Sequence, residues 1–151
     1  MPDSPRLVVV DASVVLKWQL GDEQYVAQAV AIKDDFLIRG AITLIAPHLL
    51  VCEVINGILS AVKKKRIKAG LVREMVGNFL AAGVELRSAD PWRIVELSAQ
   101  YNISAYDAAY VALAQAEGCD LWTGDRPLYQ AVRQYLPAVR WIGDYVSIAG
   151  A

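Results

Sequence analysis

The sequence predicts an α/β fold, in which a mostly parallel sheet of five strands lies between two layers of helices. The first observation is that short apolar runs alternate with longer segments of helical periodicity along the chain. The second is the stretch from Ser104 to Asp125, which reads as a buried helix, a stop at Gly118, a core strand and a loop. The third is the continuous apolar run from Leu7 to Val10, which is typical of a central parallel strand. Together these patterns favour a three-layer α/β/α sandwich.

Each expected strand is a short apolar run bounded by turn residues. The five runs are residues 7–10, 42–46, 84–87, 121–123 and 139–142. The third run, Val-Glu-Leu-Arg, is more polar than the others, so we expect it nearer an edge of the sheet.

Helices are expected between these strands, because apolar residues recur there at spacings of three and four. Ser13, Pro47, Pro91 and Ser104 are of the residue types that start helices, and glycines mark several of the ends. The expected helices cover residues 14–20, 24–39, 47–65, 70–82, 92–101, 105–117 and 127–135.

The length of 151 residues predicts one domain, residues 1–151, that buries roughly 70% of the surface its unfolded chain exposes. Apolar residues make up 56% of the chain and the mean hydropathy is +0.32, but no apolar run reaches the roughly 20 residues of a membrane span. The excess indicates a large core or an apolar interface, and we expect no membrane association. The chain begins without the layout of a signal peptide, which predicts a cytoplasmic location.

Charge and cysteine content exclude several classes of protein. The formal net charge of −1 excludes a generally basic nucleic-acid binder, so any such binding must come from a local patch. Cys52, Cys119 and the single histidine, His48, make neither a disulfide framework nor a zinc site. We interpret both cysteines as small buried hydrophobic residues.

Four acidic residues occupy positions that predict a shared site. Asp11 and Asp125 follow strands, Glu53 lies on the helix after a strand, and Asp107 lies at a helix start, so all four can meet at the carboxyl edge of the sheet. Converging carboxylates repel one another until they are protonated or bind a cation. An acidic site of oxygen ligands suits Mg²⁺ or Mn²⁺, and attack of a metal-activated water on a phosphodiester is the natural reaction. Three neutral side chains beside the acids are suited to orienting that water: Ser13, Asn56 and Thr123.

Each of these residues also has a simpler interpretation when it is taken alone. Asp107 can serve only the start of its helix, Glu53 can lie on a solvated stripe, and Asp125 can be a turn residue. Asp11 is harder to explain this way, because an unpaired charge after a core strand is unfavourable. The functional interpretation therefore depends on all four acids together.

Four segments in order give the chain its resemblance to a known family: 8–18, Val-Val-Val-Asp-Ala-Ser-Val-Val-Leu-Lys-Trp; 53–59, Glu-Val-Ile-Asn-Gly-Ile-Leu; 104–114, Ser-Ala-Tyr-Asp-Ala-Ala-Tyr-Val-Ala-Leu-Ala; and 121–128, Leu-Trp-Thr-Gly-Asp-Arg-Pro-Leu. The chain resembles PIN domains, and among them the VapC-type toxin ribonucleases. This resemblance implies a PIN-like sheet with strand order 3-2-1-4-5 and a Mg²⁺- or Mn²⁺-dependent endoribonuclease. It also implies a homodimer and an antitoxin protein that covers the site.

The resemblance assigns roles to the acids and to their neighbours. Asp11, Glu53, Asp107 and Asp125 match the metal-binding quartet of the family, and the supporting polar positions match Ser13, Asn56 and Thr123. Asp11 and Asp107 are expected as principal metal ligands, Glu53 as a residue that holds the metal or orients its water, and Asp125 as the residue that completes the pocket.

Basic residues are the candidates for contact with the RNA backbone: Lys17, Lys63, Lys64, Lys65, Arg66, Lys68 and Arg126. The cluster at residues 63–68 also fits a solvated helix end that complements the helix dipole.

Two other classes of function remain open. One is a phosphotransferase with Asp11 as nucleophile, although that chemistry usually needs a second acid at the position of Ser13. The other is a catalytically silent PIN-fold module that binds RNA or protein.

Overall fold

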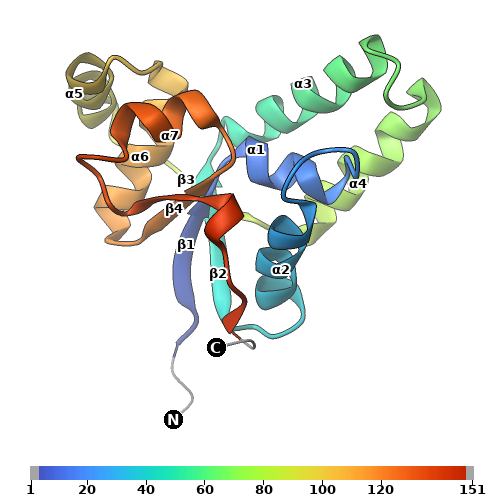
Figure 1. The fold of residues 1–151 in the computed structure, drawn as a ribbon, viewed down its shortest axis with the longest axis horizontal. Coiled ribbons are helices and arrows are strands. Elements are labelled where there is room, and N and C mark those ends of the chain that lie inside the picture. Colours follow the sequence, from blue (N-terminus) through green and yellow to red (C-terminus); the bar gives the residue numbers. More distant parts are fainter. Residues whose placement is uncertain (1–3, 149–151) are drawn as a thin grey trace.

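The structure, a computed structural model, describes residues 4–148 and contains one sheet of five parallel strands in the order β3-β2-β1-β4-β5 (Figure 1). All four strand pairings are parallel. The strands are β1 (Arg6–Val10), β2 (Ile42–Pro47), β3 (Glu85–Arg87), β4 (Asp120–Thr123) and β5 (Val139–Trp141). The predicted fold class and strand order are confirmed, and the polar third strand lies at an edge. The single-domain prediction for residues 1–151 includes six terminal residues outside the described range.

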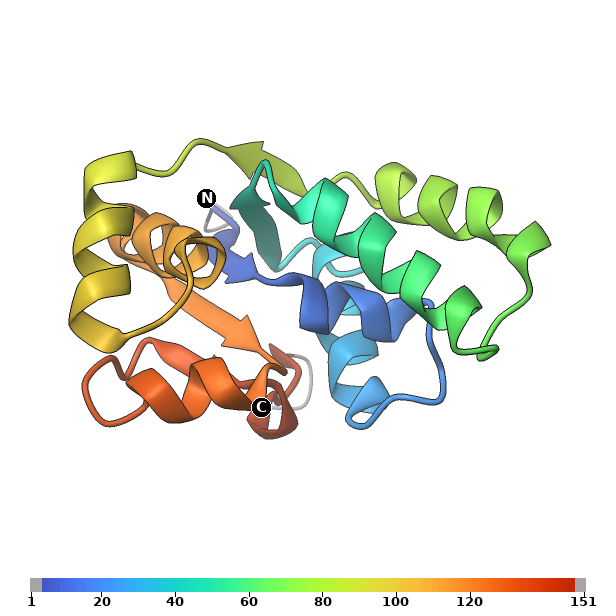
Figure 2. The same ribbon diagram turned by 90° about the horizontal axis from the view of Figure 1, so that it is seen from above.

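Helices cover both faces of this sheet. They are α1 (Ala12–Val15), the 3₁₀ helix η1 (Leu16–Trp18), α2 (Val26–Leu37), α3 (Leu50–Lys63), η2 (Ala69–Leu71), α4 (Val72–Ala82), α5 (Pro91–Tyr101), α6 (Ala105–Glu117), α7 (Arg126–Val132) and η3 (Ile142–Asp144). Figure 2 shows α1 to α4 on one side of the sheet and α5 to α7 on the other. This distribution follows from right-handed crossovers, because the chain moves outward from β1 to β3 and then returns to β4 and β5.

The core lies on both faces of the central strands. Val9 and Val10 of β1 have no exposed surface, and seven consecutive residues of α6, Ala108–Ala114, are buried. Helix α6 is buried on several sides because it contacts β1, β2 and β4 while α5 packs against it. This environment explains why its sequence is apolar nearly all the way round. Among the described residues, no helix is both long and apolar enough to cross a membrane.

Several local predictions were wrong. Pro47 ends β2, in register with Arg87, and α3 begins only at Leu50. A proline is tolerated at the end of a strand as well as at a helix start, so the residue type alone did not decide between them. Helix α7 ends at Val132, three residues earlier than predicted, and Cys52 is exposed rather than buried.

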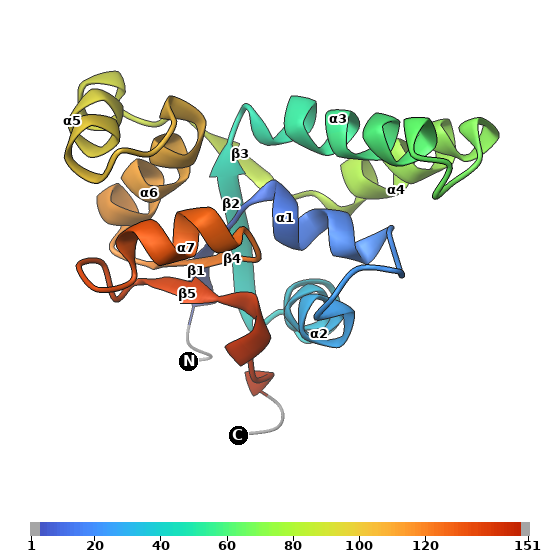
Figure 3. The ribbon, with the colours of Figure 1, turned by 45° about the horizontal axis from the view of Figure 1, so that its top comes forward.

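The strand order reverses at β1, so that β2 and β4 lie on either side of it. The chain leaves β1 and β4 toward opposite faces of the sheet (Figure 2), so the carboxyl ends of these two strands form the switch point of the sheet, where open α/β folds bind ligands. Figure 3 shows α1 and α3 leaving the upper ends of β1 and β2, close to the start of α7. The topology therefore places the segments after β1, β2 and β4 around one edge of the sheet.

A fully buried carboxylate, Asp35 of α2, holds the C-terminal segment against the domain. It accepts hydrogen bonds from Tyr145 Oη (2.6 Å), Ser147 Oγ (2.8 Å) and the backbone N–H of Ile148 (3.2 Å). Burial alone would raise the pKa of Asp35, but these bonds outweigh burial and lower the pKa below its usual value. Its charged form is therefore part of the folded structure at neutral pH.

We expect Asp35→Asn to lower the free energy of unfolding at pH 7 by about 2 kcal/mol, because the amide places donors against the N–H and O–H donors that now meet a carboxylate. Chemical denaturation monitored by tryptophan fluorescence measures the change. Asp34→Asn, on the same helix, is the matched control and should stay within about 0.5 kcal/mol of wild type. Equal unfolding midpoints for wild type and Asp35→Asn would contradict this role.

Candidate functional site

Asp11 is the central acid of the site and is buried, with 5% of its surface exposed. It caps α1, because its Oδ1 accepts a hydrogen bond from the backbone N–H of Val14 at 3.3 Å. The hydroxyl of Ser13 donates to Oδ1 and the hydroxyl of Thr123 donates to Oδ2. Burial raises the pKa of Asp11 to about 6, and the negative charge of Asp125 contributes to the rise.

Ser13 and Thr123 join the ends of β1 and β4 through Asp11. Ser13 was predicted to cap the following helix, but Asp11 takes that position and the Ser13 hydroxyl binds Asp11 instead. In addition, Ser13 Oγ accepts from the backbone N–H of Gly124 (2.7 Å), and Thr123 Oγ1 accepts from the N–H of Asp125 (3.0 Å). The two hydroxyls therefore fix the orientation of the Asp11 carboxylate.

Asp125 follows β4 and caps α7, since its Oδ1 accepts from the backbone N–H of Leu128 at 3.1 Å. Asp125 is therefore a helix cap and not the turn residue of its simpler interpretation. Its negative charge also raises the pKa of Asp11, Glu53 and Asp107. The charge of Asp125 thus acts on each of the other three acids.

Glu53 lies in the first turn of α3 and is half-buried. Its Oε1 accepts a hydrogen bond of 2.6 Å from the hydroxyl of Tyr110 on α6. Burial and the charge of Asp125 raise the pKa of Glu53, while the Tyr110 bond acts in the opposite direction. The solvated-stripe interpretation of Glu53 is therefore wrong, because α6 covers one side of its carboxylate.

Tyr110 is a site residue that the sequence analysis missed. Burial and the bond to Glu53 raise its pKa, so its hydroxyl keeps the proton that it donates. One signal in the sequence could have identified it: a tyrosine inside a buried, alanine-rich helix needs a hydrogen-bond partner for its hydroxyl.

Asp107 lies in the first turn of α6. Ser104 caps this helix as predicted, by accepting from the backbone N–H of Asp107 at 3.0 Å. The Asp107 carboxyl is therefore not needed as the cap. Burial, followed by the charges of Asp125 and Glu53, raises its pKa to about 6. The structure thus brings all four predicted acids into one electrostatic environment.

The donor set fits a hard divalent cation. The four acids offer oxygen ligands, and their repulsion is not relieved by any lysine or arginine within 4 Å of them in the described residues. A cation of Mg²⁺ type relieves such repulsion by binding the ionised forms. Within residues 4–148, no three His, Cys, Asp or Glu side chains form a ready-made metal-binding group, so an ion would have to draw these carboxylates together.

The predicted basic residues do not share one location. Lys17 is 7% exposed, and its Cε lies 3.0 Å from where a Cβ on Gly124 would be, which places its stem beside Ser13 and the acids. Arg126 is exposed next to Asp125, with its guanidinium 4.9 Å from the centre of the Trp141 ring.

The cluster at residues 63–68 lies away from the acids. At about 1.5 Å of rise per residue, Lys63 is roughly 15 Å from Glu53 along α3. Arg66 is held by Asp22 (2.6 Å) and Glu23 (3.4 Å), so it fastens the end of α3 to the loop before α2. The four lysines of the cluster are exposed: Lys63, Lys64, Lys65 and Lys68.

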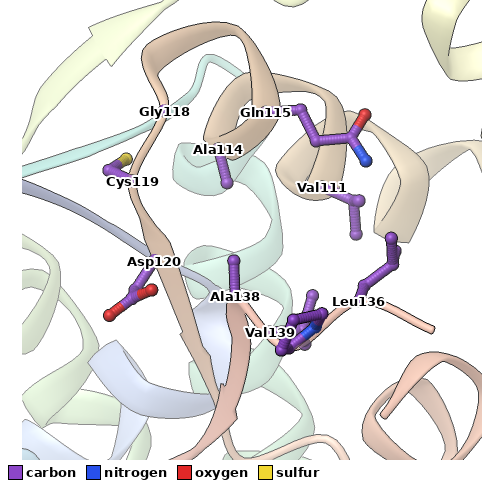
Figure 4. A pocket seen from close by; sticks show the side chains of 10 residues that line it. Val111, Ala114, Gln115, Gly118, Cys119, Asp120, Leu136, Ala138 and Val139 are labelled. Atoms are coloured by element: carbon purple, nitrogen blue, oxygen red, sulfur yellow. The ribbon is translucent and has the colours of Figure 1, made fainter. Parts of the chain in front are cut away.

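A cavity of about 220 Å³ lies at the opposite end of β4 (Figure 4). It is mostly apolar and lies between the end of α6, around Gly118, and the segment that leads into β5. Because Asp120 lines it at the start of β4 while Asp125 follows the end of that strand, this cavity is not part of the acidic site.

A three-layer α/β/α protein with strand order 3-2-1-4-5 and carboxylates at its switch point is the class that this fold and site define. The chain belongs to the PIN domain family, which matches residues 8–133.

Two curated relatives and one solved structure are similar to the chain. A Mycobacterium bovis protein named VapC ribonuclease Mb0985 is 35% identical over 121 residues, which are 79% of this chain and 86% of the relative. A Mycobacterium tuberculosis protein named Ribonuclease VapC9 has the same identity and coverage. The crystal structure of PAE2754 from Pyrobaculum aerophilum has a TM-score of 0.66 and 19% identity, over 91% of this chain and 92% of that chain. That likeness concerns the fold alone.

Proposed function

We propose that this protein is a Mg²⁺- or Mn²⁺-dependent endoribonuclease that hydrolyses RNA phosphodiester bonds. The observation that carries the proposal is the group of four acids at the switch point, where burial and mutual repulsion raise the pKa of both Asp11 and Asp107 to about 6. Repulsion among these carboxylates lowers the stability of the fold, whereas it favours the binding of a divalent cation that neutralises them. The names of the curated relatives, which are called ribonucleases, support RNA as the substrate class.

Asp11 and Asp107 would be the principal ligands of the ion, Glu53 would help to hold it or orient its water, and Asp125 would complete the acidic pocket. When bound, Mg²⁺ or Mn²⁺ supplies Lewis-acid polarisation of the phosphodiester and an activated water. Ser13 and Thr123 would position Asp11, because their hydroxyls hold both of its carboxylate oxygens in one orientation. Tyr110 does the same for Glu53 through its single hydrogen bond.

Backbone phosphates would meet the cations nearest the acids, Lys17 and Arg126, before the cluster at residues 63–68. The buried stem of Lys17 beside Gly124 supports this order, since it limits the positions that its ammonium group can take. The lysines at the far end of α3 would contact RNA only some distance along the strand from the cleaved bond.

The protein would act as the toxin of a type II toxin–antitoxin pair, as a homodimer whose site an antitoxin covers. The VapC names of the relatives support this role. Several large apolar side chains are exposed and would suit the interfaces that dimer and antitoxin require: Ile38, Leu80, Trp92 and Val95.

Cleavage of a mixed pool of structured RNA tests the proposal. We expect cutting with Mg²⁺ or Mn²⁺, none with EDTA, and recovery when excess Mn²⁺ is added back, because the carboxylates act through the ion. Electrophoresis of end-labelled RNA measures the products. A protein that cuts equally in EDTA, or in none of the metals, does not have the proposed activity. RNA binding without cutting in every metal would favour the catalytically silent module.

A further inference from the structure

A cavity of about 320 Å³ opens beside the acidic site, between α3 and the start of α6. Its lining residues are Leu49, Cys52, Glu53, Asn56 and Tyr106. Cys52, Glu53 and Asn56 lie on one side of α3, and Leu49 immediately precedes that helix. The fifth, Tyr106, immediately precedes Asp107. The cavity therefore shares Glu53 with the acidic site and adjoins Asp107 through the chain.

Tyr106 contributes a large aromatic side chain that the core does not use. Its side chain is 66% exposed, although Tyr110, one turn further along α6, is buried and bonded to Glu53. Residues four apart lie on the same side of a helix, so Tyr106 also faces α3. No aromatic ring of the described residues stacks on it. An accessible ring beside a nuclease site is a platform on which a nucleobase can stack.

The other lining residues favour a neutral planar ligand. The exposed amide of Asn56 offers both donors and an acceptor, as the edges of nucleobases require, and Leu49 adds apolar surface. No lysine or arginine lines the cavity, so its own lining offers no cation to a phosphate group. A volume of about 320 Å³ is at the lower end of the range for small-molecule sites and admits a single base.

We propose that this cavity is a nucleobase subsite, in which a base adjoining the cleaved phosphodiester stacks on Tyr106 while its edge faces Asn56. The proposal rests on the proposed nuclease function and adds a binding site for part of the same substrate. Every nucleobase can stack on an aromatic ring, so Tyr106 supplies affinity for single-stranded RNA. Hydrogen bonds between Asn56 and the edge of the base supply any preference among bases.

The proposal is tested by steady-state cleavage of a single-stranded RNA. The proteins compared are wild type, Tyr106→Ala, Tyr106→Phe and Tyr135→Ala. Tyr135 is a matched control, because it is 65% exposed, packs beside Tyr101 and does not line the cavity. We expect Tyr106→Ala to raise KM roughly ten- to a hundredfold, as loss of one stacked base does, with a smaller effect on kcat. Tyr106→Phe and Tyr135→Ala should keep the wild-type KM. An unchanged KM in Tyr106→Ala would overturn the subsite while leaving the nuclease proposal intact.

A second measurement needs no catalysis. Cys52 lines the cavity and is exposed, so its alkylation by N-ethylmaleimide, in a Cys119→Ser background, reports occupancy. Adenosine or cytidine at millimolar concentration should slow this alkylation at least twofold in the protein that retains Tyr106, and should not slow it in Tyr106→Ala. If wild type cuts no RNA but the nucleosides still protect Cys52, the nuclease proposal fails and the base site stands. If neither nucleoside protects Cys52, the base site fails whatever the cleavage result.

Discussion

Asp11→Asn should reduce metal-dependent RNA cleavage roughly 10³-fold, which corresponds to about 4 kcal/mol of lost transition-state stabilisation. Among the four acids of the site, Asp11 is the one on which the most hydrogen bonds converge, since a backbone N–H and two hydroxyls all point at its carboxylate. Asparagine keeps the shape but removes the charge and one oxygen donor. Single-turnover cleavage in Mn²⁺ measures the loss without interference from product release.

The control for this variant is Asp144→Asn, which removes an exposed acid of η3 and should cut as wild type does. A second control is the folded state of Asp11→Asn itself. Asparagine relieves the burial of a charge but sets an amide against the donors that bind Asp11, so circular dichroism and the Tm at pH 7.5 must show that the variant is folded. Wild-type cleavage by a stably folded Asp11→Asn protein would rule out Asp11 as a metal ligand.

The sequence predicted the strands well because the determining property is local. A strand covered by helices on both faces must be apolar throughout its buried part, and this is visible in a short run such as residues 7–10. The strand order came only from the family resemblance, since periodicity does not tell which strands are neighbours. The start of α3 was misplaced because Pro47 suits a strand end and a helix start equally.

The four acids could be predicted because their positions depend on chain direction and strand ends alone. The hydrogen bonds that orient the acids could not be predicted, although Ser13 and Thr123 were predicted as supporting residues. Thr123 reaches Asp11 across 112 positions of sequence, and Tyr110, which was not predicted, reaches Glu53 across 57. The burial of Lys17 depends on the absence of a side chain at Gly124, which is likewise a contact between distant segments. Local patterns carry no information about such partners.

The metal-free protein should lose stability as pH rises from about 4.5 to 7. Asp11 and Asp107 have ordinary pKa values of 3.8 but retain their protons in the folded state up to about pH 6. Between these values the folded state binds more protons than the unfolded state, so raising the pH favours unfolding. At about pH 6 each acid is half ionised, and by about pH 7 the loss is complete. Allowing for the partial exposure of Asp107, we expect a loss of about 4 kcal/mol, or roughly 10 °C in Tm.

Asp35 acts in the opposite direction, because its lowered pKa gives stability that is lost only as pH falls below its ordinary value of 3.8. The fall in stability between pH 4.5 and 7 therefore comes from the acidic site and not from Asp35. Calorimetry in EDTA measures it, and the double variant Asp11→Asn with Asp107→Asn should flatten the profile. Mn²⁺ should raise Tm at pH 7 far more than at pH 4.5, since only the ionised carboxylates bind it. A wild-type profile as flat as that of the double variant would mean that these acids are not held under mutual repulsion, and the argument for a cation at this edge of the sheet would fail with it.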